Sequence, residues 1–169
     1  MFKKCLAAAF ITALLFSHAA AGSTIEIDAQ AETEVAVGET LLFLNVLRGL
    51  PATSTVANFT INTASIPDDA IVEKITVMTG TIRTIAGTVV VDTYSLQGPG
   101  MSAPATRKWG GTTMGTAFSD TDLGGAVPVQ GRWSLYFTAR TVSPRSGSVS
   151  HNIPTVKIRY SYKKKIRQP

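Results

Sequence analysis

A strict alternation of apolar and polar residues constrains the fold of this chain more than any other feature of its sequence. In residues 24–37 the odd positions are apolar or small, while most even positions are Glu, Asp or Gln. The same period of two governs residues 132–142 and 155–163. Because side chains of a β-strand point alternately to opposite faces, each segment is predicted to be a strand with one buried and one solvated face.

Shorter segments of the same kind fill much of the remaining chain. They share apolar or β-branched side chains and are bounded by turn residues: residues 41–47, 55–62, 71–79, 81–85, 88–96 and 112–118. No stretch after residue 21 has the periodicity of an amphipathic helix. The chain is therefore predicted to be all-β, an antiparallel β-sandwich or jelly roll of about eight strands that follows an N-terminal signal helix. We expect its last two strands to pair with each other across a loop at residues 143–152.

Residues 1–21 have the three parts of a secretory signal peptide. Lys3 and Lys4 precede an apolar run at residues 5–16, and small residues end the segment before Gly22, where cleavage is expected. The run is shorter than the about 20 residues that span a bilayer, so the mature form is predicted to have no transmembrane segment. We therefore expect a secreted, periplasmic or cell-surface protein.

Cleavage changes the chemistry of the chain that remains. It removes Cys5, the single cysteine, and two lysines, which takes the formal net charge from +5 to +3. The mature chain is predicted to be one β-sandwich domain at residues 22–162 and a basic tail at residues 163–169. The tail could contact anionic lipid, nucleic acid or an acidic partner, but we expect a solvated terminus. Export and the lack of interleaved aromatic residues argue against nucleic acid.

Aspartates in two loops are candidate metal ligands. Asp120 and Asp122 alternate ahead of Gly124, a pattern that suits calcium because this ion takes several oxygen ligands in a bent loop. Asp68 and Asp69 could complete such a site if folding brought them near. The alternative is that all four aspartates cap turns in their own backbone.

Candidate binding residues are aromatic, and catalytic residues are lacking. Trp109 lies in a glycine-rich loop and Tyr136 on the predicted outward face of its strand, so either could stack on a sugar or contact a protein. The alternative for Trp109 is a loop anchor packed on the sheet edge. His151 is the one histidine after the signal peptide, and no G-x-S-x-G motif accompanies it, so no enzyme is predicted.

Several short motifs in residues 66–162 resemble the P-domain, the β jelly roll that follows the catalytic domain of subtilisin-like proprotein convertases. They occur in the family's order: IPD at 66–68, LQGPG at 96–100, FSD at 118–120 and GRWSL at 131–135. The sequence departs from the family at residues 84–91, which lack its His-Thr and Gly-Asp-Leu features, and at Ala139 and Arg140, which replace an acidic residue. The resemblance implies a jelly-roll framework and raises the expectation of calcium.

Two functions are consistent with these observations. The first is an exported, non-catalytic binding or accessory module that resembles a P-domain and contacts a protein or glycan partner through the loops at residues 97–131 and 143–152. The alternative is a fimbrial or surface-assembly subunit, or an adhesin. In that case the long strand at residues 24–37 would pair with a neighbouring copy as a donor strand, and the protein would self-assemble.

Overall fold

A computed structural model describes residues 24–109 and 115–167, except the side chains of residues 43–46. The signal helix predicted for residues 1–21 lies outside the described residues. The described chain forms ten strands and no helix: β1 (Thr24–Val46), β2 (Ala52–Thr53), β3 (Ala57–Ile61), β4 (Ile71–Val77), β5 (Ile82–Ala86), β6 (Val89–Gln97), β7 (Ala105–Lys108), β8 (Thr116–Ser119), β9 (Gly131–Thr141) and β10 (Gly147–Arg167). Within these residues, no helical segment has the length and hydropathy that crossing a membrane requires.

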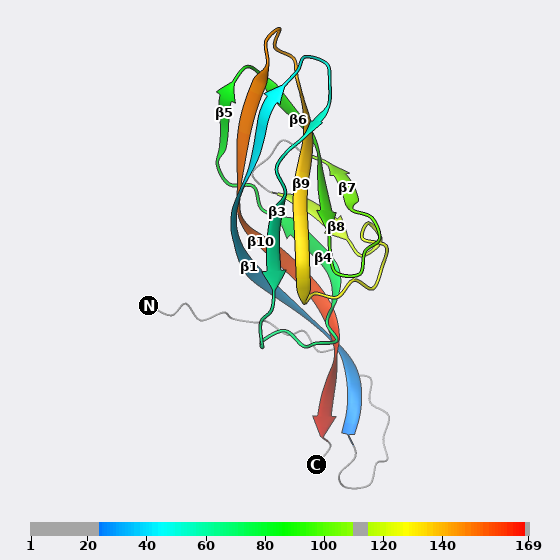
Figure 1. The fold of residues 1–169 in the computed structure, drawn as a ribbon. Helices are drawn as coiled ribbons and strands as arrows, with labels where there is room; N and C mark the ends of the chain where they lie inside the picture. Colours follow the sequence, from blue (N-terminus) through cyan, green and yellow to red (C-terminus); the bar gives the residue numbers. More distant parts are fainter. Residues whose placement is uncertain (1–23, 110–114, 168–169) are drawn as a thin grey trace, which may run out of the picture.

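The strands form two sheets that pack face to face (Figure 1). One sheet has the order β1-β10-β4-β8, with β5 also paired to β10. The other has the order β2-β9-β6-β7, with β3 also paired to β9. Every pairing between named strands is antiparallel. The predicted antiparallel β-sandwich is thus confirmed, and the short strands β2 and β7 bring the count above the expected eight.

The alternation of β9 shows how the sequence builds the core. Trp133, Leu135 and Phe137 are completely buried between the sheets, whereas Arg132 and Arg140 point to solvent. The Trp133 indole N–H donates to the carbonyl of residue 129 at 3.0 Å, so burial of this ring leaves no polar atom unpaired. Each large apolar side chain buried in this way contributes roughly 1.5–3 kcal/mol, which makes the intersheet core the main source of stability.

The predicted pairing of residues 132–142 with residues 155–163 is wrong. β9 pairs with β2, β3 and β6, whereas β10 pairs with β1, β4 and β5 in the opposite sheet. Both strands turn an apolar face inward, and these two faces are buried against each other across the core. The connection between them also differs from the expected ten-residue loop, because β10 begins at Gly147 and only residues 142–146 cross between the sheets.

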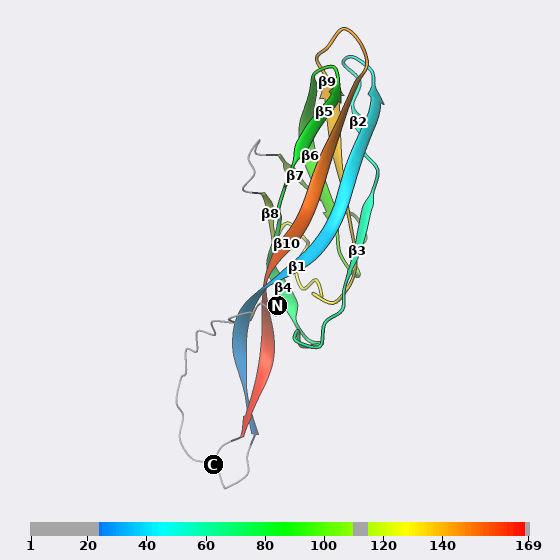
Figure 2. The same ribbon diagram turned by 90° about the vertical axis from the view of Figure 1, so that its left-hand side faces the viewer.

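The first and last strands run the length of the molecule (Figure 2). β1 continues through Gly38, where a bulge and a φ of 67° interrupt the register without ending the strand. Residues 162–167 of β10 pair only with residues 24–29 of β1, and this two-stranded ribbon extends beyond the sandwich. Most of the segment that the sequence sets apart as a basic tail, residues 163–167, therefore belongs to a strand.

Candidate functional site

Two loops enclose a groove of about 370 Å³ at the end of the sandwich nearer the ribbon. One loop, residues 99–105, joins β6 to β7, and the other, residues 122–128, lies between β8 and β9. Both belong to the region at residues 97–131 that the sequence predicts to carry contacts. Small, apolar and proline residues line most of the groove, with Asp122 as its one charged residue.

The first loop is fixed against the core. At Gly98 a Cβ atom would lie 2.6 Å from two ring carbons of Trp133, so only glycine allows this close approach. The Gly98 N–H donates to the sulfur of Met101 at 3.0 Å, and the Gln97 amide donates to the carbonyl of Met101 at 3.0 Å. The start of this wall is therefore held by the buried tryptophan and by its own hydrogen bonds.

The second loop combines two buried anchors with an unusual backbone between them. Leu123 and Val127 are only 4% and 5% exposed, respectively. Between these anchors Gly124, Gly125 and Ala126 all have positive φ, with Ala126 at 51°. A residue with a Cβ atom loses roughly 1–2 kcal/mol in this left-handed region, and such strain persists where its surroundings dictate the conformation. Strained backbone of this kind clusters at ligand-binding sites, which directs attention to this wall.

Asp122 gives the groove a carboxylate whose charge Arg107 partly offsets. Its Oδ2 accepts hydrogen bonds from the backbone N–H and the hydroxyl of Ser119, each at 2.8 Å. Arg107 lies 2.8 Å from the same oxygen. The Ser119 hydrogen bonds, with the positive charge of Arg107, lower the pKa of this carboxyl below its ordinary value. Asp122 is therefore ionised at neutral pH, and its Oδ1 has no partner within the described chain.

The other three candidate calcium ligands have partners of their own. Asp120 Oδ1 accepts the N–H of residue 121 at 2.7 Å, a bond within its own loop. Asp68 Oδ1 accepts the Gln130 amide at 3.1 Å, and Asp69 Oδ2 accepts the N–H of Lys163 at 3.0 Å. Across residues 24–109 and 115–167, no three His, Cys, Asp or Glu side chains gather as a metal site would need. Calcium binding stays a prediction.

The two candidate aromatic residues lie outside the groove. Trp109 is half-buried and packs with its ring centroid 5.3 Å from that of His151, as a loop anchor would. Its indole nitrogen is buried with no hydrogen-bond partner among the described residues. Tyr136 is half-buried on the outward face of β9. Neither ring lines the groove.

A buried histidine is the feature that the sequence interpretation missed. His151 is 1% exposed, its Nδ1 lies 2.7 Å from the Tyr94 hydroxyl, and its ring stacks 4.9 Å from Phe137. Loss of hydration lowers its pKa from 6.5 to about 4 and raises that of Tyr94 to about 12, so both side chains are neutral at pH 7. The sequence feature that could have revealed this burial is the alternation of Val149, His151 and Ile153, all of which point into the core.

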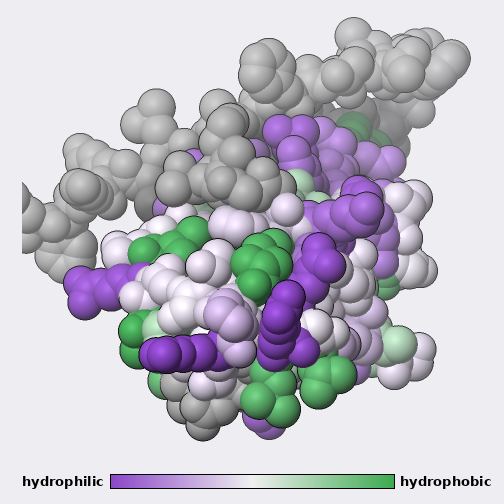
Figure 3. Space-filling model, turned by 90° about the horizontal axis from the view of Figure 1, so that it is seen from above, coloured by the Kyte–Doolittle hydropathy of each residue, from purple (hydrophilic) through white to green (hydrophobic). Residues whose placement is uncertain are grey.

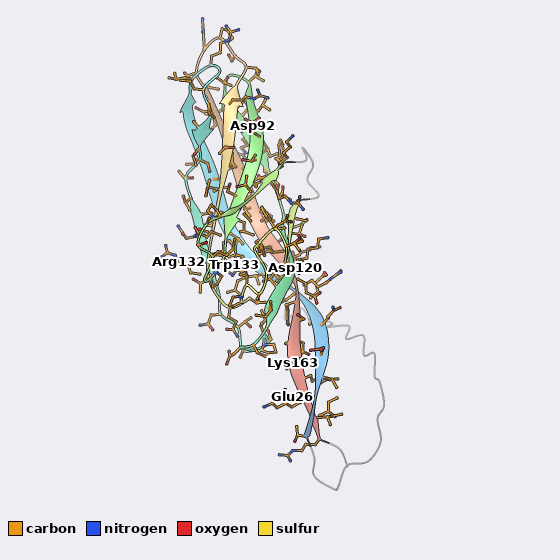
Figure 4. The ribbon with its side chains drawn as sticks, turned by 90° about the vertical axis from the view of Figure 1, so that its right-hand side faces the viewer. Glu26, Asp92, Asp120, Arg132, Trp133 and Lys163 are labelled. Atoms are coloured by element: carbon orange, nitrogen blue, oxygen red, sulfur yellow. The ribbon has the colours of Figure 1, made fainter. Side chains whose placement is uncertain are left out.

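Charged residues join the two strands of the ribbon and of the sheet edge next to it. Four acidic side chains of β1 face four basic side chains of β10: Glu26 and Lys165, Asp28 and Lys163, Glu32 and Arg159, Glu34 and Lys157. Figure 4 shows Glu26 and Lys163 in the ribbon. The Asp28 carboxylate, through its hydrogen bond and charge, raises the pKa of Lys163. Opposite charges across a strand pair define its register more than they add to stability.

No protein family model matches this chain, and no curated protein and no solved structure is significantly similar to it. The function of the chain must therefore be inferred from its own residues.

Proposed function

We propose that this chain is an exported, non-catalytic binding module whose groove, between residues 99–105 and residues 122–128, holds an extended peptide segment of a partner protein. The observation that carries the proposal is the strained backbone of Ala126, which follows two glycines of positive φ in a wall beside an ionised carboxylate. Backbone strain is retained where it positions groups for binding. The predicted signal peptide supports a site of action outside the cytoplasm, in the periplasm, at the cell surface or in the medium.

The lining favours a peptide over a glycan. Sugar recognition commonly uses an aromatic ring as a stacking platform. None of the groove's lining residues is aromatic, and the two half-buried rings considered for this role, Trp109 and Tyr136, lie elsewhere. Prolines and small side chains instead leave backbone groups accessible, which suits an extended chain with its own N–H and C=O groups.

A carboxylate oxygen in the groove favours a ligand residue that donates hydrogen bonds, such as lysine or arginine, although Arg107 already pairs with the other oxygen. Asp122 is the groove's one charged lining residue, and its Oδ1 is left without a partner in the described chain. A lysine or arginine of the peptide would supply the missing charge-assisted hydrogen bond. Pro99, Pro104 and Pro128 restrict the walls before binding, so less conformational entropy is lost when the ligand enters.

The resemblance of residues 66–162 to the P-domain adds support for an accessory role. Three residues that carry it are among the most buried of the chain: Ile66 at 2%, and Phe118 and Trp133 at 0% exposed. These side chains build the framework, whereas most of the groove residues lie in the loops that it carries. A framework with variable loops is the arrangement by which β-sandwiches carry binding functions.

A peptide array probed with the exported protein tests the proposal. Ser102 is exposed and lines the groove, so Ser102→Trp should obstruct it without touching the core. Thr60→Trp, on the exposed face of β3, is the matched control. We expect wild type and Thr60→Trp to select the same lysine- or arginine-containing peptides and Ser102→Trp to lose them. Equal selection by all three proteins, or selection by none, would contradict the proposal.

A second candidate, a surface-assembly subunit, is favoured by the free edge of β1. This strand lies at the edge of its sheet, where Thr55 bonds both backbone groups of Leu42. The edge of β1 that precedes Leu42 could take a further strand. Pairing with β10 occupies the other edge from Thr24 to Val46, so assembly would add a strand to β1 rather than exchange it as a donor. Polymers on native gels that disappear when residues 24–29 are deleted would support assembly, and monomers at every concentration would oppose it.

A further inference from the structure

Three segments, made of connections and the strands beside them, converge at the end of the sandwich opposite the ribbon. The Gly49 N–H donates to the carbonyl of Thr141 at 3.4 Å, and the Val142 N–H donates to the carbonyl of Thr88 at 3.1 Å. These contacts bring residues 47–51, 82–90 and 140–148 together, and we refer to this end as the tip (Figure 1, top). β9 connects the tip to the groove end, and its eleven residues place the two roughly 35 Å apart.

Large apolar side chains are exposed at the tip. Leu47, Leu50, Ile85 and Val142 are 59%, 57%, 58% and 56% exposed, respectively. Figure 3 looks onto this end and shows hydrophobic side chains separated by hydrophilic ones. Scattered exposed apolar residues are ordinary, but four that gather on neighbouring segments indicate an interaction surface.

The hydrophilic component of the tip is positive. Its three segments contain four arginines, Arg48, Arg83, Arg140 and Arg145, and no acidic residue. Arg140 pairs with Asp92 at 3.2 Å. The other three have no carboxylate partner in the part of the chain that the structure describes. At the opposite end, by contrast, acidic side chains of β1 pair with Lys163 and Lys165 of the ribbon.

We propose that the tip docks on an anionic lipid surface, with its apolar side chains in the bilayer interface and its arginines on lipid phosphates. Interfacial binding strength combines buried apolar area with electrostatic attraction to anionic lipids, and the tip supplies both. Guanidinium groups suit phosphate because their paired N–H donors match its oxygens. Docked in this way, the protein would hold the groove and the ribbon away from the membrane.

Charge argues against a second copy of the chain as the occupant. Two tips brought together would place at least six unpaired guanidinium groups at one small interface with no carboxylate to offset them, which costs free energy. The apolar side chains of the tip also project from connections and from β5, whereas protein interfaces concentrate their affinity in pockets filled by anchor residues. Projecting apolar residues beside arginines fit a soft, anionic surface better.

Vesicle co-sedimentation of the exported protein tests the proposal. We expect binding to vesicles that contain phosphatidylglycerol, weakening with added salt, and little binding to phosphatidylcholine alone. Arg48→Ala/Arg145→Ala should weaken binding about 25-fold, since each cation near an anionic surface contributes about fivefold. Arg132→Ala/Lys164→Ala removes the same charge away from the tip (Arg132 in Figure 4) and should have at most about a twofold effect.

A tryptophan probe tests whether apolar side chains enter the bilayer. Emission of a Leu47→Trp variant should shift to the blue with phosphatidylglycerol vesicles, whereas Val56→Trp, at an exposed position outside the tip, should not shift.

Ser102→Trp should sediment like wild type, which separates lipid docking from peptide binding in the groove. Absence of vesicle binding, equal losses in both arginine pairs, or no shift for Leu47→Trp would each overturn the proposal. Dimers that Leu47→Ser/Leu50→Ser abolishes, without vesicle binding, would assign the tip to a second copy.

Discussion

The buried pair of His151 and Tyr94 predicts a specific loss of stability in mild acid. The histidine has a pKa of about 4 in the folded protein and 6.5 when exposed by unfolding. Between these values the unfolded chain binds a proton that the folded chain refuses, so stability falls as the pH falls. The contribution is complete above about pH 6.5 and is lost as the pH approaches about 4.

The size of the effect follows from the same two pKa values. A shift of one pKa unit corresponds to about 1.4 kcal/mol, so the full loss below pH 4 approaches about 3 kcal/mol. At about pH 5 the expected loss is roughly 2 kcal/mol, a large part of the stability of an ordinary domain. The pKa of Asp122 is lowered from 3.8, so protonation of Asp122 affects stability only at more acidic pH. It therefore does not contribute to the loss expected at about pH 5.

Urea unfolding at about pH 7 and about pH 5 measures the loss directly. The matched variant is Tyr94→Phe/His151→Phe, which removes both polar partners from the core together. It also removes the Tyr94 hydroxyl that lies 3.5 Å from the Thr79 hydroxyl, a long hydrogen bond whose loss should leave the variant folded. We expect the pH-dependent loss in wild type and a clearly smaller one in the double variant. A wild-type protein equally stable at both pH values, or a double variant with the same loss, would refute the assignment.

Three further predictions concern the groove walls and the ribbon. Gly98→Ala should lower the free energy of unfolding in urea by about 1–3 kcal/mol, because its Cβ meets the Trp133 ring; an unchanged value would show that the loop is not held as described. Ala126→Gly should raise the free energy of unfolding by about 0.5–1 kcal/mol by relieving the positive φ, yet weaken peptide binding because the wall gains freedom. Lys163→Glu should lower the melting temperature by placing like charges opposite Asp28, and added salt should reduce the loss; a salt-independent change would exclude charge as the cause.

The sequence predicted the strands better than their arrangement. The alternation in residues 24–37 and 132–142 identified β1 and β9 as strands, because a period of two depends only on local geometry. It also identified the buried face of β9, but the odd positions of residues 24–37 are at most half-buried, so the face predicted to be buried in β1 is not. The same pattern cannot say in which sheet a strand lies, since inward-facing residues look alike from either side of a core. This ambiguity is why β9 and β10 were expected to pair, although they face each other from opposite sheets.

Residues of apparently polar segments were the hardest to predict. The letters GSVSHN at residues 147–152 suggest a loop, yet they begin β10 and bury His151, because Tyr94 from the other sheet supplies its hydrogen bond. No local rule identifies a partner 57 positions away. The pairing of β1 with the basic end of β10 could be predicted more easily from the sequence. Glu26 and Asp28 have the same spacing as Lys163 and Lys165, so opposite charges meet when the strands pair antiparallel.

The groove could be located from the sequence only as a region. Glycines and prolines in residues 97–131 indicated connecting loops, and loops carry binding functions. That two parts of this region face each other depends on the pairing of β7 with β6 and of β8 with β4. The role of Asp122 depends likewise on Arg107, which arrives from a different strand.

Hydrogen exchange with and without a selected peptide tests the central claim most directly. If the groove is the binding site, saturating peptide should slow exchange of the backbone amides in residues 99–105 and 122–128 and leave residues 142–146 unchanged. The same footprint should be missing when Ser102→Trp replaces the wild-type protein. Protection along β1 or at the tip, with no change in the two groove loops, would contradict the account.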